Sequence, residues 1–159
     1  MKIKVLFVCM GNICRSPTAQ GVFEKLLDDT QLTDRIQVDS AGTHAYHVGE
    51  PPDHRAQTSA GRRGIDLSRQ RARRVAVEDF DAFDYVVAMD AENKASLLAI
   101  CPEEFHNKVT LFMVHTSDYS QDSVPDPYYG GASGFEKVLD MVEAASLGFL
   151  ETIKQERGL

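Results

Sequence analysis

The chain has 159 residues, of which 43% are hydrophobic and 26% are charged, and this composition indicates one globular domain over residues 1–159. Its formal net charge of −7 argues against general binding to nucleic acid. The three cysteines do not form a disulfide framework, and neither a membrane span nor a signal peptide is evident. We therefore expect a cytoplasmic protein.

Hydrophobic patterns along the chain alternate between the period of a strand and that of a helix. Short apolar runs predict four strands, at residues 3–8, 36–41, 85–89 and 109–112. Helical spacing of apolar residues predicts helices after Ser16, at about 53–63, at 91–100 and at about 133–157, with a brief helical turn near 77–80. Strands that alternate with helices predict an α/β fold with a parallel sheet, in which ligands bind beyond the carboxyl ends of the strands.

The stretch between the first strand and the first helix carries the residues most typical of a reactive site. It reads Cys9-Met10-Gly11-Asn12-Ile13-Cys14-Arg15-Ser16-Pro17. A loop that enters a helix in this way aims backbone N–H groups and the helix N-terminus at one point, which binds an anion. Cys9 is expected to lose its thiol proton easily there, and the planar guanidinium of Arg15 can grip two phosphate oxygens. These residues predict phosphoryl transfer through a cysteinyl-phosphate.

The small and polar residues of the same stretch fit a tight loop. Gly11 and Asn12 are residue types that tolerate left-handed backbone conformations. Ser16 suits the helix N-cap, and Pro17 suits the first helical turn. The alternative, in which Cys9 is an ordinary core cysteine and Arg15 a surface charge, explains none of these choices.

A second reactive group is predicted within residues 113–132, which carry no periodic pattern and therefore indicate a functional or disordered loop. Asp126 lies between Pro125 and Pro127, which stiffen the chain on either side of it. An alcohol or phenol leaving group needs a proton, and Asp126 is a candidate to donate it and later to accept one from water. Taken alone, the segment also fits a Pro-Asp-Pro surface turn.

The reactive stretch and the later segment together resemble the low-molecular-weight protein tyrosine phosphatases. The matching motifs are Cys9-x5-Arg15-Ser16-Pro17, Asp39-Ser40-Ala41-Gly42-Thr43, Ala88-Met89-Asp90-x-x-Asn93 and Asp126-Pro127-Tyr128-Tyr129. Other tyrosine phosphatases have a histidine before the cysteine and an acid upstream of it, whereas this chain has Val8 and a downstream acid. The resemblance implies a Rossmann-like, three-layer α/β fold with a four-stranded parallel twisted sheet between helices. It also implies an enzyme that hydrolyses phosphotyrosine and uses no metal and no cofactor.

The resemblance further implies a role for each reactive residue. Cys9 attacks phosphorus, Arg15 stabilises the equatorial oxygens, and Asp126 is general acid and then general base. Ser16 hydrogen-bonds the sulfur and eases its departure. The remaining residues of the phosphate cradle are Met10, Gly11, Asn12, Ile13 and Cys14.

Supporting and substrate-facing residues follow from the same resemblance. Ser40 is expected to bond Asn12, and Asp90, which follows the third strand, is expected at the same edge of the sheet as Cys9. Gln70 stands where animal members carry a histidine that supports the loop. The aromatic walls of the substrate slot are expected to be Tyr46, Tyr128 and Tyr129. The implied partner is a tyrosine-phosphorylated protein, and the chain itself is expected to be a monomer or a weak homodimer.

Several features permit two interpretations. The seven arginines between residues 55 and 74 form either an ion-paired surface or a basic rim that attracts an acidic substrate. Cys14 is either a small buried side chain or a disulfide partner of Cys9 that protects the nucleophile, whereas Cys101 is expected to be structural. The loosely spaced His44, His47 and His54 are not expected to bind a metal.

Other functions fit the residues less well. An arsenate reductase of the same fold needs further relay cysteines, for which Cys101 is poorly placed. A protein-arginine phosphatase typically carries a threonine where this chain has Ile13. A phosphate-binding module without catalysis could dispense with Cys9 or Asp126, yet both are present.

Overall fold

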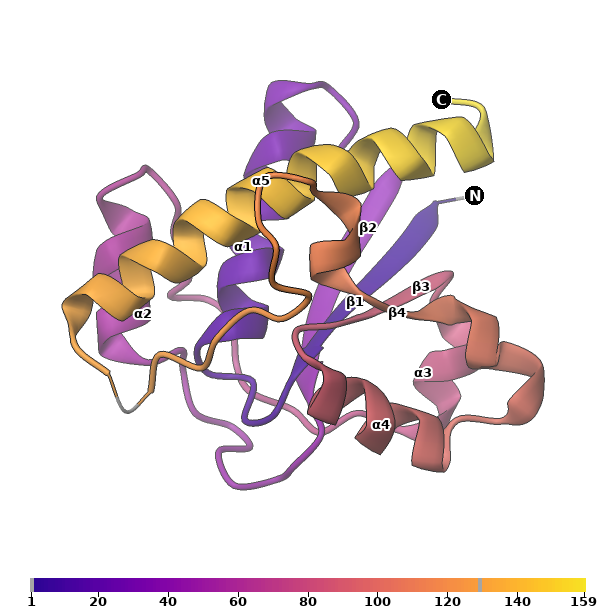
Figure 1. The fold of residues 1–159 in the computed structure, drawn as a ribbon, viewed down its shortest axis with the longest axis horizontal. Coiled ribbons are helices and arrows are strands. Elements are labelled where there is room, and N and C mark those ends of the chain that lie inside the picture. The colour runs from indigo at the N-terminus through magenta and orange to yellow at the C-terminus, as the bar shows by residue number, and fades with distance from the viewer. Residues whose placement is uncertain (1, 129) are drawn as a thin grey trace.

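Four parallel strands form the sheet of the computed structural model, which describes residues 2–128 and 130–159 (Figure 1). The strands are β1 (Ile3–Cys9), β2 (Ile36–Gly42), β3 (Tyr85–Ala88) and β4 (Val109–Leu111), in the spatial order β2-β1-β3-β4. The pairing register places Cys9 beside Gly42 and Val8 beside Ala88, so β1, β2 and β3 end at one edge of the sheet. The predicted strands are therefore confirmed, each to within one residue at its ends.

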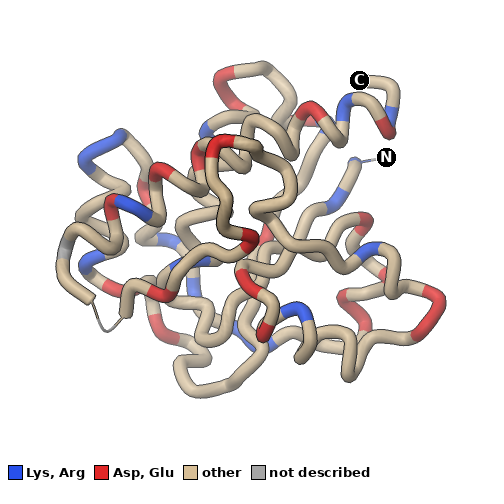
Figure 2. Tube along the Cα trace, viewed as in Figure 1, with Lys and Arg blue, Asp and Glu red and all other residues tan. Residues whose placement is uncertain are grey.

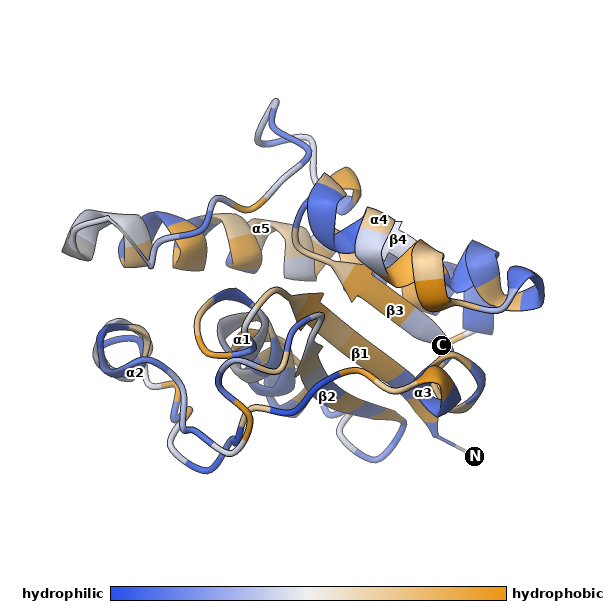
Figure 3. Cartoon of the chain, turned by 90° about the horizontal axis from the view of Figure 1, so that it is seen from below, coloured by the Kyte–Doolittle hydropathy of each residue, from blue (hydrophilic) through white to orange (hydrophobic). Residues whose placement is uncertain are grey.

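Helices connect the strands and cover both faces of the sheet. They are α1 (Arg15–Asp29), α2 (His54–Gly61), α3 (Val77–Ala82), α4 (Ala91–Ile100) and α5 (Ala132–Arg157), with two 3-10 helices, η1 (Glu103–Lys108) and η2 (Phe112–His115). The sheet is thus sandwiched between helices, as Figure 3 shows with the apolar strands in orange between more polar elements. The predicted three-layer α/β fold is confirmed.

Alternation along β1 explains why the sheet has two buried faces. Val5, Phe7 and Cys9 belong to a core cluster that includes residues of α1, α2 and α5. Leu6 and Val8 point the opposite way, into a cluster that includes residues of α3 and α4. Successive side chains of a strand point to opposite faces, so a continuously apolar strand requires cover on both sides.

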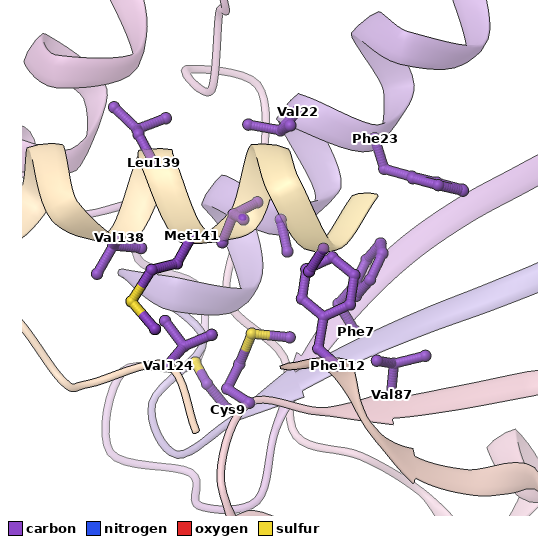
Figure 4. Packing of buried hydrophobic residues seen from close by; sticks show 14 of the residues in the cluster. Phe7, Cys9, Val22, Phe23, Val87, Phe112, Val124, Val138, Leu139 and Met141 are labelled. Carbon is purple, nitrogen blue, oxygen red and sulfur yellow. The ribbon is translucent and has the colours of Figure 1, made fainter. Parts of the chain in front are cut away.

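The larger cluster is built around aromatic rings (Figure 4). The ring centroid of Phe7 lies 5.0 Å from that of Phe112, 5.7 Å from that of Phe23 and 6.1 Å from that of Phe149. Full burial of one such ring stabilises the fold by about 1.5–3 kcal/mol. Cys9 belongs to the same cluster, so the packing of these rings supports the strand that carries it.

Charges of both signs are interspersed over the chain (Figure 2), and the arginine-rich segment takes part in ion pairs. Arg63 lies 2.9–3.0 Å from three carboxylates of α5. Arg73 pairs with Asp39 at 3.1 Å and with Asp79 at 2.9 Å. For these arginines the ion-paired interpretation is correct. No helix within the described ranges is long and apolar enough to cross a bilayer.

Candidate active site

The reactive loop lies where β1 ends at Cys9 and α1 begins at Arg15, and we call residues 9–15 the Cys9 loop. Asn12 has a φ of 57°, in the left-handed region that its residue type tolerates, and its backbone N–H donates to the sulfur of Cys9 at 3.3 Å. Gly11 does not have a positive φ. A Cβ there would lie 3.0 Å from the ring of His47, so a larger residue would need that ring to shift by a few tenths of an ångström.

The side chain of Asn12 connects the Cys9 loop to two other segments. Its amide nitrogen donates to the hydroxyl oxygens of Ser16 at 2.8 Å and of Ser40 at 3.0 Å. Its oxygen accepts from the backbone N–H of Arg73 at 3.0 Å. The loop is thus held against the carboxyl end of β2 and against the segment that follows α2. Asn12 is only 3% exposed, so these bonds are shielded from water.

Ser40 in turn donates to Gln20 of α1 at 2.8 Å and, at a longer 3.5 Å, to Gln70. Gln70 also donates to the carbonyl of Pro17 at 3.0 Å. Gln70 therefore contacts the supporting network from the position at which animal members of the resembled family carry a histidine.

Ser16 does not cap α1, so this expectation is wrong. The residue at the N-cap position is Cys14, which makes no side-chain capping bond, and Ser16 lies inside the first turn. The reason is that its hydroxyl is already engaged: it accepts from Asn12 and lies 3.1 Å from the sulfur of Cys9. The hydroxyl of Ser16 thus contacts the sulfur of Cys9 and does not cap the helix.

Arg15 is buried, with 3% exposure, and carboxylates surround its guanidinium. Its Nη1 donates to Asp90 at 2.6 Å and to the carbonyl of Val124 at 3.1 Å, and its Nη2 lies 3.7 Å from Asp126. Burial lowers the pKa of Arg15, but Cys9, Asp90 and Asp126 outweigh burial and raise the pKa above its ordinary value. Arg15 is therefore a fixed positive charge at the base of the site.

Asp90 and Asp126 reach Arg15 from different parts of the chain. Asp90 is the N-cap of α4, where its Oδ1 accepts from the backbone N–H of Asn93 at 2.7 Å. Asp126 lies in the Asp126 loop (residues 124–128 and 130), which begins with a bond from the N–H of Val124 to the carbonyl of Met89 at 2.8 Å. This contact brings Asp126 to the edge of the sheet where β1 ends.

A pocket of about 320 Å³ opens above these groups. It is lined by Cys9, Met10, Gly11, Ile13, Cys14, Arg15, Tyr46, His47, Asp126 and Tyr128. Tyr46 is 74% exposed and stacks on His44 with ring centroids 5.2 Å apart. Tyr128 lies 6.2 Å from His47 by the same measure, and Tyr129 falls outside the described residues. The pocket thus combines a polar base with aromatic walls.

Cys14 lines this pocket as well, but its thiol differs chemically from a reactive one. Burial, followed by the charges of Asp53, Cys9 and Asp126, raises the pKa of the Cys14 thiol well above its ordinary value. In the structure Cys14 and Cys9 are both buried with free thiols, which agrees with the interpretation of Cys14 as a small buried side chain; a disulfide between the two stays the alternative interpretation. Within the described part of the chain, no group of three His, Cys, Asp or Glu residues is arranged to hold a metal ion.

A family model described as low molecular weight phosphotyrosine protein phosphatase matches residues 4–159. The chain belongs to this family. It is 39% identical over 157 residues to the low molecular weight protein-tyrosine-phosphatase YfkJ of Bacillus subtilis, covering 99% of each chain. It is 41% identical over 148 residues to the human low molecular weight phosphotyrosine protein phosphatase, covering 92% of this chain and 93% of the human one.

Solved structures of other phosphatases agree closely with this one. The protein tyrosine phosphatase of Entamoeba histolytica, crystallised with Hepes in its active site, superposes with a TM-score of 0.93 at 41% identity over 99% of each chain. The YfkJ crystal structure superposes with a TM-score of 0.90 at 39% identity, covering 98% of this chain and 97% of that one. The chain is therefore a phosphatase, that is, a phosphoric monoester hydrolase.

Two residues near the phosphatase pocket were not identified from the sequence as parts of the site. His47 lines the pocket and pairs with Glu50 at 2.8 Å, but in the sequence it appears only as one of several histidines in a loop. Gln20 bonds Ser40 from one turn into α1, and no local pattern distinguishes it from other helical glutamines. Their proximity to the site depends on tertiary structure.

Proposed function

We propose that this phosphatase hydrolyses phosphotyrosine and small aryl phosphates through a phosphocysteine intermediate on Cys9. The observation that carries the proposal is that Cys9, Arg15 and Asp126 line one pocket although they come from β1, α1 and a distant loop. A nucleophile, a cation and a carboxyl group within one aromatic-walled pocket match the needs of an in-line displacement on a phosphate monoester.

In the first step, the sulfur of Cys9 attacks phosphorus, an S–P bond forms and the ester P–O bond breaks. The protonated carboxyl group of Asp126 gives its proton to the departing oxygen. Arg15 and the backbone N–H groups of residues 10–15, apart from that of Asn12, which donates to the sulfur, hold the three equatorial oxygens. The attacking thiolate is stabilised by the N–H of Asn12 and by the hydroxyl of Ser16.

In the second step, water attacks phosphorus and Asp126, now a carboxylate, accepts a proton from it. The S–P bond breaks, the electron pair returns to the sulfur, and inorganic phosphate leaves. Ser16 donates a hydrogen bond to the departing thiolate, which its distance of 3.1 Å supports. Each residue thus serves both steps, and the enzyme returns to its starting protonation state.

The shape of the pocket favours phosphotyrosine over other phosphoryl groups. Tyr46 and Tyr128 offer aromatic surfaces to a phenyl ring. Ile13 adds an apolar wall with no hydrogen-bonding group for a phosphorylated guanidinium. A tyrosine-phosphorylated protein is therefore the proposed class of substrate.

The test measures phosphate release from a phosphotyrosine peptide and a phosphoarginine peptide by the wild type, Cys9→Ser and a control, Cys101→Ser. Cys101 is also buried but belongs to the cluster on the other face of the sheet. We expect hydrolysis of the phosphotyrosine peptide alone, lost in Cys9→Ser and retained in Cys101→Ser. Activity that survives in Cys9→Ser contradicts the assignment of the nucleophile. A wild type that is active mainly on phosphoarginine contradicts the assignment of the substrate.

A second variant tests the acid. We expect Asp126→Asn to lower kcat/KM for phenyl phosphate by about 10²–10⁴-fold, the usual contribution of a positioned general acid. The loss is expected to be much smaller for 2,4-dinitrophenyl phosphate, whose leaving group departs without a proton. Equal losses on the two substrates would assign Asp126 another role.

A further inference from the structure

Arg55 lies outside the pocket, yet its contacts connect the two halves of the site. It forms a two-pronged pair with Asp53, with Nε donating to Oδ1 at 3.1 Å and Nη2 to Oδ2 at 3.0 Å. Asp53 is the N-cap of α2, and its backbone N–H donates to the carbonyl of Ile13 in the Cys9 loop at 2.7 Å. One side of the Arg55 guanidinium is therefore fixed to the loop that carries the nucleophile.

Other donors of the guanidinium reach the Asp126 loop. Nη2 donates to the carbonyl of Tyr128 at 2.9 Å, and Nη1 donates to the carbonyl of Gly130 at 3.4 Å. The guanidinium carbon also lies 4.8 Å from the ring centroid of Phe135 in α5, at cation–π distance. Arg55 thus joins α2, the Asp126 loop and the start of α5.

Tyr128 links this contact directly to the proposed acid. Its carbonyl accepts from Arg55, while its backbone N–H donates to Oδ1 of Asp126 at 3.0 Å. The other carboxylate oxygen, Oδ2, faces Nη2 of Arg15 at 3.7 Å. The orientation of the Asp126 carboxylate therefore depends on where the backbone of Tyr128 is held, and Arg55 holds it.

We infer that Arg55 is a positioning residue for the general acid, keeping Asp126 in place over the Cys9 loop; the inference rests on the proposed function. Val124 anchors the start of the Asp126 loop by its bond to Met89, and Arg55 anchors the far end. A displacement of about 1 Å at a reacting group is enough to cost about 10²-fold in rate. Only arginine has the planar fork that can bond a carboxylate and two carbonyls at once.

The test compares Arg55→Met and Arg55→Lys with the wild type on phenyl phosphate and on 2,4-dinitrophenyl phosphate. We expect Arg55→Met to lower kcat/KM for phenyl phosphate by about tenfold or more, and for the dinitrophenyl ester by less than about threefold. Arg55→Lys keeps the charge but not the planar fork, so we expect its kcat/KM for phenyl phosphate to lie between those of the wild type and Arg55→Met. The matched control is Arg62→Met, an exposed arginine just beyond the other end of α2, which leaves both values unchanged.

A double-mutant cycle separates positioning from a purely structural role. If Arg55 acts through Asp126, then Arg55→Met added to Asp126→Asn causes no further loss on phenyl phosphate. A further loss of similar size in the double mutant overturns the inference, and so does an equal loss on both substrates in the single mutant. Wild-type activity of Arg55→Met on phenyl phosphate overturns it too. Thermal unfolding tests whether each variant is folded. If Arg55→Met is unfolded, the inference is decided by the loss of Arg55→Lys on phenyl phosphate.

The same experiments distinguish a failure of this inference from a failure of the proposed function. If Cys9→Ser keeps its activity, or if Asp126→Asn hydrolyses phenyl phosphate like the wild type, the proposed function has failed. If those two variants behave as expected while Arg55→Met does not, only the positioning role of Arg55 is rejected.

Discussion

Replacing Asn12 with alanine tests whether its side chain holds the Cys9 loop in shape. The change removes the bonds to Ser16, Ser40 and the backbone of Arg73, which have lengths of 2.8, 3.0 and 3.0 Å. At about 1 kcal/mol of net stabilisation each, their loss lowers the free energy of unfolding by about 3 kcal/mol. Alanine at a φ of 57° adds about 1 kcal/mol of backbone strain, for a total of about 4 kcal/mol.

Glycine at the same position separates the two contributions. Asn12→Gly loses the same hydrogen bonds but not the strain, while the freedom of glycine in the unfolded chain offsets part of that relief. We therefore expect Asn12→Gly to be more stable than Asn12→Ala by about 0.5 kcal/mol. Urea unfolding followed by circular dichroism measures both, with the exposed Asn107→Ala as the control. A loss below about 1 kcal/mol in Asn12→Ala, or a glycine variant less stable than the alanine one, would refute this reasoning.

Three further predictions concern stability away from the pocket. Gly148→Ala would place a Cβ onto the carbonyl oxygen of His115, so we expect a loss of about 3 kcal/mol or more by urea unfolding, whereas Gly61→Ala, with open space around it, is neutral or mildly stabilising. Arg63→Met removes the contacts to three carboxylates of α5; the expected loss is about 1 kcal/mol, and it shrinks in about 1 M salt because exposed ion pairs are screened. Burial holds the pKa of His115 below its ordinary value, so as pH falls the unfolded chain binds a proton that the folded chain does not. The free energy of unfolding should therefore decrease from about pH 7.5 to about pH 5.5, and the decrease should be smaller in His115→Gln.

The sheet and most helices could be predicted because their signals are local. A continuous apolar run such as that of β1 indicates a strand covered on both faces, and the alternation of such strands with helices indicates a parallel sheet between helices. The boundaries of α4 were predictable for a similar reason: Asp90 caps its start, and Pro102 follows its end closely. Much of the pocket followed as well, since the residues of the Cys9 loop are contiguous and Asn12 has the left-handed conformation that its type tolerates.

The remaining parts of the site depend on contacts between distant segments. Ser16 is a good N-cap residue by type, but the adjacent Asn12 and Cys9 engage its hydroxyl instead. Gly11 suits a left-handed conformation by type, but its φ is not positive, and the ring of His47 lies close to where a Cβ would be. Arg55 appears in the sequence as one of many arginines, and only the fold brings it to the Asp126 loop. In each case a contact formed in the folded chain decides the role of the residue, which its type and its neighbours in the sequence do not indicate.

The contacts of Arg15 show how the site can bind a phosphate without first rearranging. Nη1 is held by Asp90 and by the carbonyl of Val124, and Asp90 is itself fixed as the cap of α4. Neither Nε nor Nη2 donates a hydrogen bond to any residue that the structure describes, and Asp126 stands off from Nη2 at 3.7 Å. If phosphate binds as proposed, two of its oxygens can accept from Nε and Nη2 of a guanidinium that is already oriented. Little reorganisation of the Arg15 side chain is then needed for binding or for stabilising the charge that develops in the transition state. The same reasoning explains why an arginine so deeply buried is accompanied by two acids: Asp90 bonds Nη1, Asp126 faces Nη2 from 3.7 Å, and together they compensate the buried charge.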